Sequence, residues 1–320
     1  MKFPTFKDII AAQQRISKFL DYTPLHSYPL LNKFLETEVY VKHENFQPTG
    51  AFKIRGGLNL ISQLSIEEKK RGVITASTGN HGQSIALASK IFGVKAKICV
   101  PENSNPVKLA AMHHYDAEII EFGKDFDEAR VNAEKLAEKH GYRYIHSGNE
   151  PLLIAGVGTI GLEILQQQPD IEVIISPVGA GTGCGGTAIA AKSIDPELEM
   201  IAVQAEKAPS VYQSWRSGKL ESTDSAETMA DGLATRQAFS LPTDILREWV
   251  NEFYLVTEEE IKQAIKTYLK LCHTVAEGAG AAPLAAAINM KEKLKGKKVA
   301  LVLSGGNLDY NILENIINNL

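Results

Sequence analysis

One lysine stands where an amine could act as a nucleophile. Lys53 follows Gly50, Ala51 and Phe52 rather than other charged residues, so its surroundings are apolar. Desolvation lowers the pKa of a lysine and leaves more of its uncharged amine, which is the nucleophilic form. Because most lysines lie on the surface, the residue type alone favours an ordinary exposed lysine. A chemical role for Lys53 therefore depends on what the rest of the chain supplies.

A glycine-rich segment follows the apolar run at residues 173–176. It reads Gly179-Ala180-Gly181-Thr182-Gly183-Cys184-Gly185-Gly186. Backbone N–H groups left open by glycines at the start of a helix bind phosphate, and Thr182 adds a hydroxyl. We interpret the segment as a phosphate cradle, with a purely structural glycine loop as the alternative.

The same segment satisfies a second pattern. Gly181, Gly183 and Gly186 have the spacing of a dinucleotide-binding fingerprint, and Glu206 follows where an acid that binds ribose would stand. A nicotinamide- or flavin-dependent oxidoreductase is therefore an alternative. It gives no role to Lys53.

Two further loops follow apolar runs. The first reads Ser77-Thr78-Gly79-Asn80-His81-Gly82-Gln83, and its hydroxyls, amide and backbone N–H groups suit a carboxylate. An ordinary helix cap by Ser77 or Asn80 is the alternative. In the second, Ser304 ends the run 299–303 and offers one neutral hydrogen bond, although a plain turn is the alternative. The chain therefore supplies four features: the amine of Lys53, a phosphate cradle, a carboxylate site and the hydroxyl of Ser304 for a heterocycle. Together they match pyridoxal 5'-phosphate chemistry.

Apolar runs that alternate with helical patterns predict an α/β fold with mainly parallel sheets and helices on both faces. We expect helices near 82–92, 126–140 and 258–273, and strands at 38–42, 72–77, 96–101, 117–122, 143–146, 173–178, 200–204, 252–256 and 298–304. In such sheets ligands bind at the carboxyl ends of the strands, which is where the three loops lie.

The composition excludes several classes of function. The chain has 320 residues, 44% of them hydrophobic and 22% charged, and its net charge of −4 gives no reason to expect a nucleic-acid partner. We also expect no membrane partner, because no apolar run is long enough to span a bilayer. Three distant cysteines, Cys99, Cys184 and Cys272, favour a reducing cytoplasm over a disulfide framework.

Nearly the whole chain resembles the fold-type II pyridoxal-phosphate enzymes, in which tryptophan synthase β has the same fold. Within them it is similar to the threonine/serine dehydratase and serine racemase group. The motif Thr49-Gly50-Ala51-Phe52-Lys53-Ile54-Arg55-Gly56 carries the resemblance, with Tyr22-Thr23-Pro24-Leu25 and Ser304-Gly305-Gly306-Asn307 near its two ends.

The resemblance implies a role for each site residue. Lys53 would form the Schiff base and remove the Cα proton, and Thr78 would face it across the ring. The cofactor would be bound by Phe52, Asn80 (at the 3-hydroxyl), Gly179, Ala180, Gly181, Thr182, Gly183, Gly232, Glu277 and Ser304 (at the pyridine nitrogen). The substrate carboxylate would be bound by Ser77, Thr78, Gly79, Asn80 and His81.

The resemblance also implies two lobes. A large cofactor-binding domain would comprise residues 1–43 and 151–320, and a small domain of residues 44–150 would close over the substrate. Relatives are commonly homodimers or homotetramers. Many bind a divalent cation near the position of Glu206, but the segment after it lacks a second acid, so we expect no metal.

The function implied is deamination of a β-hydroxy amino acid such as L-threonine or L-serine. Serine racemase is the nearest alternative, because Thr78 keeps the hydroxyl of the racemase serine but adds a methyl group. A hydroxyaspartate or a hydroxyectoine-derived amino acid as substrate, and a non-catalytic amino-acid-binding module, are also open. Loops at 210–215 and 236–239 are expected to form the walls of the substrate pocket.

Overall fold

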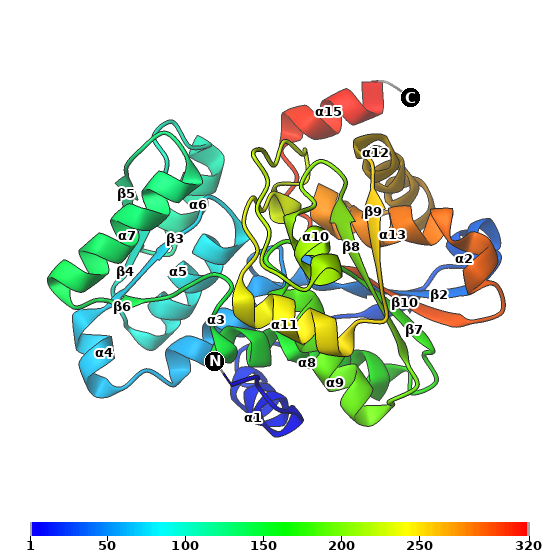
Figure 1. The fold of residues 1–320 in the computed structure, drawn as a ribbon, viewed down its shortest axis with the longest axis horizontal. Coiled ribbons are helices and arrows are strands. Elements are labelled where there is room, and N and C mark those ends of the chain that lie inside the picture. Colours follow the sequence, from blue (N-terminus) through cyan, green and yellow to red (C-terminus); the bar gives the residue numbers. More distant parts are fainter. Residues whose placement is uncertain (1, 319–320) are drawn as a thin grey trace.

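Two separate sheets organise the chain in the computed structural model, which describes residues 2–318 (Figure 1). The larger sheet has the strand order β1-β2-β10-β7-β8-β9, and only the β1–β2 pair is antiparallel. Its strands are β1 (Leu25–Ser27), β2 (Glu38–His43), β7 (Val173–Pro177), β8 (Glu199–Ala205), β9 (Glu252–Val256) and β10 (Lys298–Leu303).

The smaller sheet is parallel throughout, with the strand order β5-β4-β3-β6. Its strands are β3 (Val73–Ala76), β4 (Ala96–Val100), β5 (Glu118–Glu121) and β6 (Arg143–Tyr144). All four lie within residues 44–150, which supports the proposed division into a small domain and a large domain made of both chain ends.

Helices cover both faces of each sheet, so the predicted α/β class is confirmed (Figure 1). The helices are α1 (Phe6–Ile16), α2 (Pro29–Leu35), α3 (Lys53–Ser62), α4 (Ile66–Arg71), α5 (Asn80–Phe92), α6 (Pro106–His114), α7 (Phe126–His140), α8 (Pro151–Gln167), α9 (Thr182–Ile194), α10 (Ser210–Ser217), α11 (Ser240–Trp249), α12 (Glu258–Thr267), α13 (Gly278–Asn289), α14 (Lys291–Leu294) and α15 (Tyr310–Asn318). Short 3₁₀ turns occur at Glu44–Phe46 (η1) and Asp231–Leu233 (η2).

Each sheet buries apolar side chains on both faces. In the large sheet, Ile175 and Leu301 pack with α12 and α13, whereas Ile174 and Ala300 pack with α8 and α9 on the opposite face. A strand that is buried on both faces needs a continuous apolar run, which is why these strands were recognisable in the sequence. No helix in the described part of the chain is long and apolar enough to cross a membrane.

The structure corrects two expected elements and adds one strand that was not expected. The strand expected at 143–146 ends at Tyr144, and the short strand β1 was not predicted. The helix expected at 258–273 is interrupted, because α12 ends at Thr267 and a π-helical turn, η3 (Tyr268–Cys272), follows. His273 then takes a left-handed conformation, with φ of 53°, which ends the helical path.

Candidate active site

A cavity of about 820 Å³ lies at the carboxyl ends of β3, β7 and β10. Its wall contains every site residue expected from the sequence, namely Phe52, Lys53, Ser77, Thr78, Gly79, Asn80, His81, Gly179, Ala180, Gly181, Thr182, Gly183, Gly232, Glu277 and Ser304. Residues that are up to about 250 positions apart in the chain therefore meet at one site, as expected for the strand ends of parallel sheets.

Lys53 is the first residue of α3 and lies at the cavity wall. Its Nζ donates a hydrogen bond of 3.0 Å to Oγ1 of Thr182 and lies 5.0 Å from the centroid of the Phe52 ring. Burial lowers the pKa of Lys53 to about 8. Near neutral pH the uncharged amine, which a nucleophile or a base requires, is therefore far more populated than in an ordinary lysine.

The glycine segment forms the start of α9, with Gly181 as the N-cap residue at φ of +91°. The N–H groups of residues 179–183 have no protein acceptor within the described residues. A Cβ on Gly183 would lie 2.8 Å from the Phe52 ring, and one on Gly179 would lie 2.1 Å from the carbonyl oxygen of Gly232. Glycine is thus required for packing, and the run of free N–H groups can bind a phosphate.

The loop after β3 offers hydrogen-bond donors to the same cavity. Oγ of Ser77 accepts hydrogen bonds from the N–H groups of Gly79 and Gly82, over 3.2 and 3.0 Å, so its own proton remains to be donated. The backbone N–H groups of Thr78, Asn80 and His81 have no protein acceptor among residues 2–318. These groups suit a substrate carboxylate, as the sequence indicated.

The side chain of His81 is neutral, because burial lowers its pKa to about 3. Oγ1 of Thr75 donates to the carbonyl oxygen of Ile145 over 2.8 Å, so it must accept from Nε2–H of His81, 3.0 Å away. The other ring nitrogen, Nδ1, then carries a lone pair, and it has no partner. His81 can therefore meet a carboxylate with its backbone N–H but not with its ring.

A buried carboxylate organises Asn80. Nδ2 of Asn80 donates to both oxygens of Glu277, over 2.9 and 3.1 Å, and the N–H of Asn307 donates to Glu277 over 3.2 Å. Burial raises the pKa of Glu277. Nδ2 of Asn307 also donates to Oδ1 of Asn80, over 2.8 Å. One lone pair of that oxygen is left to accept from a ligand hydroxyl. Asn307 belongs to the motif Ser304-Gly305-Gly306-Asn307, but its contact with Asn80 was not predicted from the sequence.

Two neighbours complete the same end of the cavity. Ser304 is buried, and its hydroxyl has no hydrogen-bond partner within residues 2–318, so it is free to meet a ring nitrogen. A Cβ on Gly232 would lie 2.8 Å from the Cβ of Ala279 and 3.6 Å from Glu277. Glycine at this position leaves room beside the carboxylate.

Ion pairs across the cavity were not expected from the sequence. Arg236 pairs with Asp127 and, over 3.6 Å, with Asp125. Lys108 pairs with Asp231 and, over 3.5 Å, with Asp309. These partners are more than 100 positions apart, so no local pattern could reveal them.

Two segments were predicted from the sequence to form the pocket walls, and only one of them lines the cavity. Residues 236, 237 and 239 line the cavity, as expected. The segment at 210–215 does not, because it forms most of α10 and packs against α11. The expectation for that segment was wrong.

Glu206 lies outside the cavity wall and is exposed, so it has no part in this site. Within residues 2–318, no group of three or more acidic, histidine or cysteine side chains is arranged to hold a metal ion.

Comparison with known proteins agrees with this geometry. Residues 16–305 match the family model described as "Pyridoxal-phosphate dependent enzyme". The chain belongs to this family. Its dependence on pyridoxal phosphate fits the free N–H groups of residues 179–183 and the amine of Lys53.

Individual relatives are similar over nearly the whole chain. L-threonine ammonia-lyase of Thermotoga maritima is 44% identical over 314 residues, which is 98% of this chain and 78% of the relative. Serine racemase of Schizosaccharomyces pombe is 36% identical over 306 residues, covering 96% and 95% of the two chains. The solved structure of maize serine racemase superimposes with a TM-score of 0.94 at 32% identity, covering 99% and 98%.

Proposed function

We propose that this enzyme deaminates a β-hydroxy amino acid such as L-threonine or L-serine to a 2-oxo acid and ammonia. One observation carries the proposal. The amine of Lys53, with its lowered pKa, lines the same cavity as a run of free N–H groups suited to phosphate and a second set suited to a carboxylate. The similarity to the L-threonine ammonia-lyase of Thermotoga maritima supports the same reaction.

The cofactor is proposed to be held by residues from four parts of the chain. The N–H groups of residues 179–183 would bind its phosphate, and Phe52 would pack beside its ring. Asn80 would accept from the 3-hydroxyl, and Ser304 would meet the ring nitrogen. Attached to Lys53, the group supplies a sink for electrons released at Cα.

The chain's own groups then bind the substrate and move its proton. The loop at 77–81 orients the substrate carboxylate, with Ser77 and backbone N–H groups as donors. The amine of Lys53, freed when the substrate amine takes its place, removes the Cα proton and passes it to the departing β-hydroxyl, which leaves as water. The released enamine becomes an imine, which water hydrolyses to the 2-oxo acid and ammonia. Glu277 holds Asn80 in place during these steps.

Racemisation of serine is the second candidate, and Thr78 is the observation that favours it. Thr78 lines the cavity and is exposed there, so its hydroxyl is available as a second acid or base. The similarity to serine racemase of Schizosaccharomyces pombe supports this reading. A hydroxyaspartate or hydroxyectoine-derived substrate stays open.

We also propose an assembly state and a cellular location. A homodimer or homotetramer and a cytoplasmic location are proposed, the latter supported by three buried cysteines that form no disulfide. Closure of the proposed small domain over the substrate is supported by the ion pairs of Lys108 and Arg236 across the cavity.

The test uses purified protein loaded with pyridoxal phosphate. We expect L-threonine or L-serine, among a panel of L-amino acids, to yield a 2-oxo acid and ammonia. Lys53→Ala is expected to lose the visible absorbance of lysine-bound cofactor and all turnover, whereas Lys192→Ala, near the end of α9 and outside the cavity wall, is expected to keep both. Substantial turnover by Lys53→Ala would overturn the proposed role of this lysine.

A further inference from the structure

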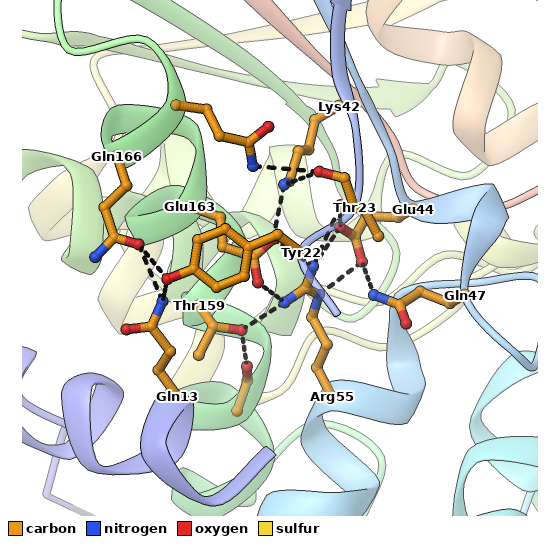
Figure 2. A network of polar contacts seen from close by, with 12 residues as sticks. Gln13, Tyr22, Thr23, Lys42, Glu44, Gln47, Arg55, Thr159, Glu163 and Gln166 are labelled. Atoms are coloured by element: carbon orange, nitrogen blue, oxygen red, sulfur yellow. Dashed lines mark hydrogen bonds and ion pairs between the residues drawn. The ribbon is translucent and has the colours of Figure 1, made fainter. Parts of the chain in front are cut away.

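A network of charged side chains is buried beneath the start of α3, outside the cavity wall (Figure 2). Lys42, Glu44 and Arg55 are fully buried, and Glu163 is 2% exposed. They come from β2, η1, α3 and α8, so the network joins the large sheet to two helices. The proposed reaction uses none of these groups.

Arg55 is at the centre of this network, and all of its nitrogens are bonded. Nε and Nη2 donate to the two oxygens of Glu44, over 2.7 and 2.8 Å. Nη1 and Nη2 donate to the two oxygens of Glu163, over 2.6 and 2.8 Å. Nη1 also donates to Thr159 of α8, over 3.1 Å. Such paired, planar contacts fix the direction of the guanidinium as well as its distance.

The positive and negative charges of the network are equal in number. Nζ of Lys42 donates to Glu163 over 2.7 Å and to the carbonyl oxygen of Thr23 over 2.8 Å. Two cations therefore face two carboxylates. Burial raises the pKa of Glu44, but the charge and hydrogen bonds of Arg55, together with the charge of Lys42, outweigh burial and hold that pKa below its usual value. The network is thus charged in the folded protein.

Stability alone is a weak reason for this arrangement. Replacing a buried ion network with apolar residues of similar volume is often neutral or stabilising. In addition, Arg55 is the third residue of α3, where the helix dipole disfavours a cation. The position of the network is more informative, because α3 begins with Lys53 two residues earlier.

Helix α8 connects this network to the phosphate-binding segment. A Cβ on Gly156 of α8 would lie 2.6 Å from the carbonyl oxygen of Arg55. On α8, Cβ atoms at Gly158 and Gly161 would lie 2.9 and 2.4 Å from the carbonyl oxygens of Gly186 and Thr187 in α9. The backbones of α3, α8 and α9 are therefore in direct contact. The first residues of α3 and α9 are Lys53 and Thr182, whose side chains are hydrogen-bonded.

We propose that Arg55, Glu44 and Glu163 form a positioning unit that fixes the amine of Lys53 relative to the phosphate-binding segment. Glu163 holds Arg55 to α8, and α8 sets the distance between the starts of α3 and α9. The three residues act through Lys53 and do not touch the cofactor. This inference rests on the proposed role of Lys53 in binding the cofactor.

The test removes charge from the network in two ways. Glu163→Gln leaves a surplus cation in the interior. Lys42→Met with Glu163→Gln keeps the charges balanced while removing the carboxylate that ties Arg55 to α8, so this double variant is expected to fold. The matched control is Lys293→Met, which loses its pairs with Glu199 and Glu252 at the far ends of β8 and β9.

The first measurement is made on full-length protein without cofactor. Acylation of Lys53 by acetic anhydride is followed against pH by mass spectrometry, and the wild-type midpoint is expected near the lysine's pKa of about 8. In both network variants we expect the midpoint to rise by about 0.5 unit or more, because the amine moves to a more solvated position. The control is expected to keep the wild-type midpoint.

The second measurement is the affinity for pyridoxal phosphate, from the absorbance of the lysine-bound form. We expect a loss of about tenfold or more in the network variants, since small misplacements of reacting groups have large effects. A folded double variant with wild-type acylation and affinity would overturn the proposal. Failure of both variants to fold would also overturn it, because the network would then serve stability only.

The proposed function is checked separately in the wild-type protein. Borohydride reduction followed by peptide mapping is expected to place the cofactor on Lys53. Attachment elsewhere would contradict the proposed role of Lys53. Correct attachment combined with unaffected network variants would contradict only the positioning unit.

Discussion

The side chains of Lys53 and Thr182 are hydrogen-bonded over 3.0 Å, and each residue is the first of its helix. The N-termini of α3 and α9 therefore meet at one point of the cavity. Because helix N-termini carry free N–H groups and partial positive charge, this point suits an anion. An amine and an anion site are thereby placed in contact by two elements of the backbone.

Removal of the Thr182 hydroxyl tests this relationship. Thr182→Val is expected to weaken binding of pyridoxal phosphate by about fivefold, because a hydrogen bond of this kind contributes about 1 kcal/mol. Thr182→Ser keeps the hydroxyl and is expected to bind nearly as the wild type does. Equilibrium titration followed by absorbance measures both. Equal affinities of the two variants would show that the hydroxyl has no part in binding.

Two glycines of the phosphate-binding segment should differ in their tolerance of alanine. A Cβ on Gly179 would meet the backbone at 2.1 Å, so Gly179→Ala is expected to abolish cofactor binding. A Cβ on Gly183 would meet the ring of Phe52 at 2.8 Å, and a ring can shift, so Gly183→Ala is expected to bind weakly. The reverse order of the two affinities would contradict this explanation.

The lowered pKa of Lys53 predicts how stability depends on pH. Between about pH 8 and the ordinary lysine value of 10.5, the unfolded chain keeps a proton that the folded protein has lost. The free energy of unfolding therefore rises with pH in this window through Lys53. Below the folded pKa, the full cost of burying the charged amine remains.

The measurement compares cofactor-free wild type with Lys53→Met by denaturant unfolding from pH 7.5 to 10.5. Subtraction removes the contributions of other groups that titrate in this range. The wild type is expected to gain stability relative to the variant as the pH rises. A constant difference would show that Lys53 has an ordinary pKa.

The Thr78 hydroxyl in the cavity wall predicts the balance between elimination and racemisation. Thr78→Ser removes a methyl group from the cavity wall and keeps the hydroxyl, so we expect more D-serine per 2-oxo acid formed from L-serine. Thr78→Ala, which lacks the hydroxyl, is expected to form none. Chiral chromatography of both products measures the ratio. Racemisation by Thr78→Ala would assign the second acid or base to another group.

Much of the fold was recognisable from local sequence, because buried parallel strands need unbroken apolar runs. The strand at Val299–Leu303 is such a run, and it lies within β10. The short strand β1 was missed, since its three residues are partly or fully exposed and show no pattern. The π-helical turn was missed because Tyr268–Cys272 continues the spacing of an ordinary helix.

The residues of the candidate site also fall into those that local sequence predicts and those that it does not. Residues in compact motifs, such as Lys53 and the glycine segment, were singled out and lie together in the cavity. The partners of Arg55 were not, because Glu163 is 108 positions away and only the packing of α3 on α8 brings them together. Long-range pairs of charges leave no local trace in one sequence.

The cavity is built from two unlike parts. The end with Lys53 rests on helices whose backbones touch, whereas the wall at residues 224–229 is irregular chain. Changes in that wall alter the space for a side chain without moving the helix starts. Single substitutions in this loop can therefore change which amino acid the cavity accepts. Attachment of the cofactor at Lys53 is not changed by them.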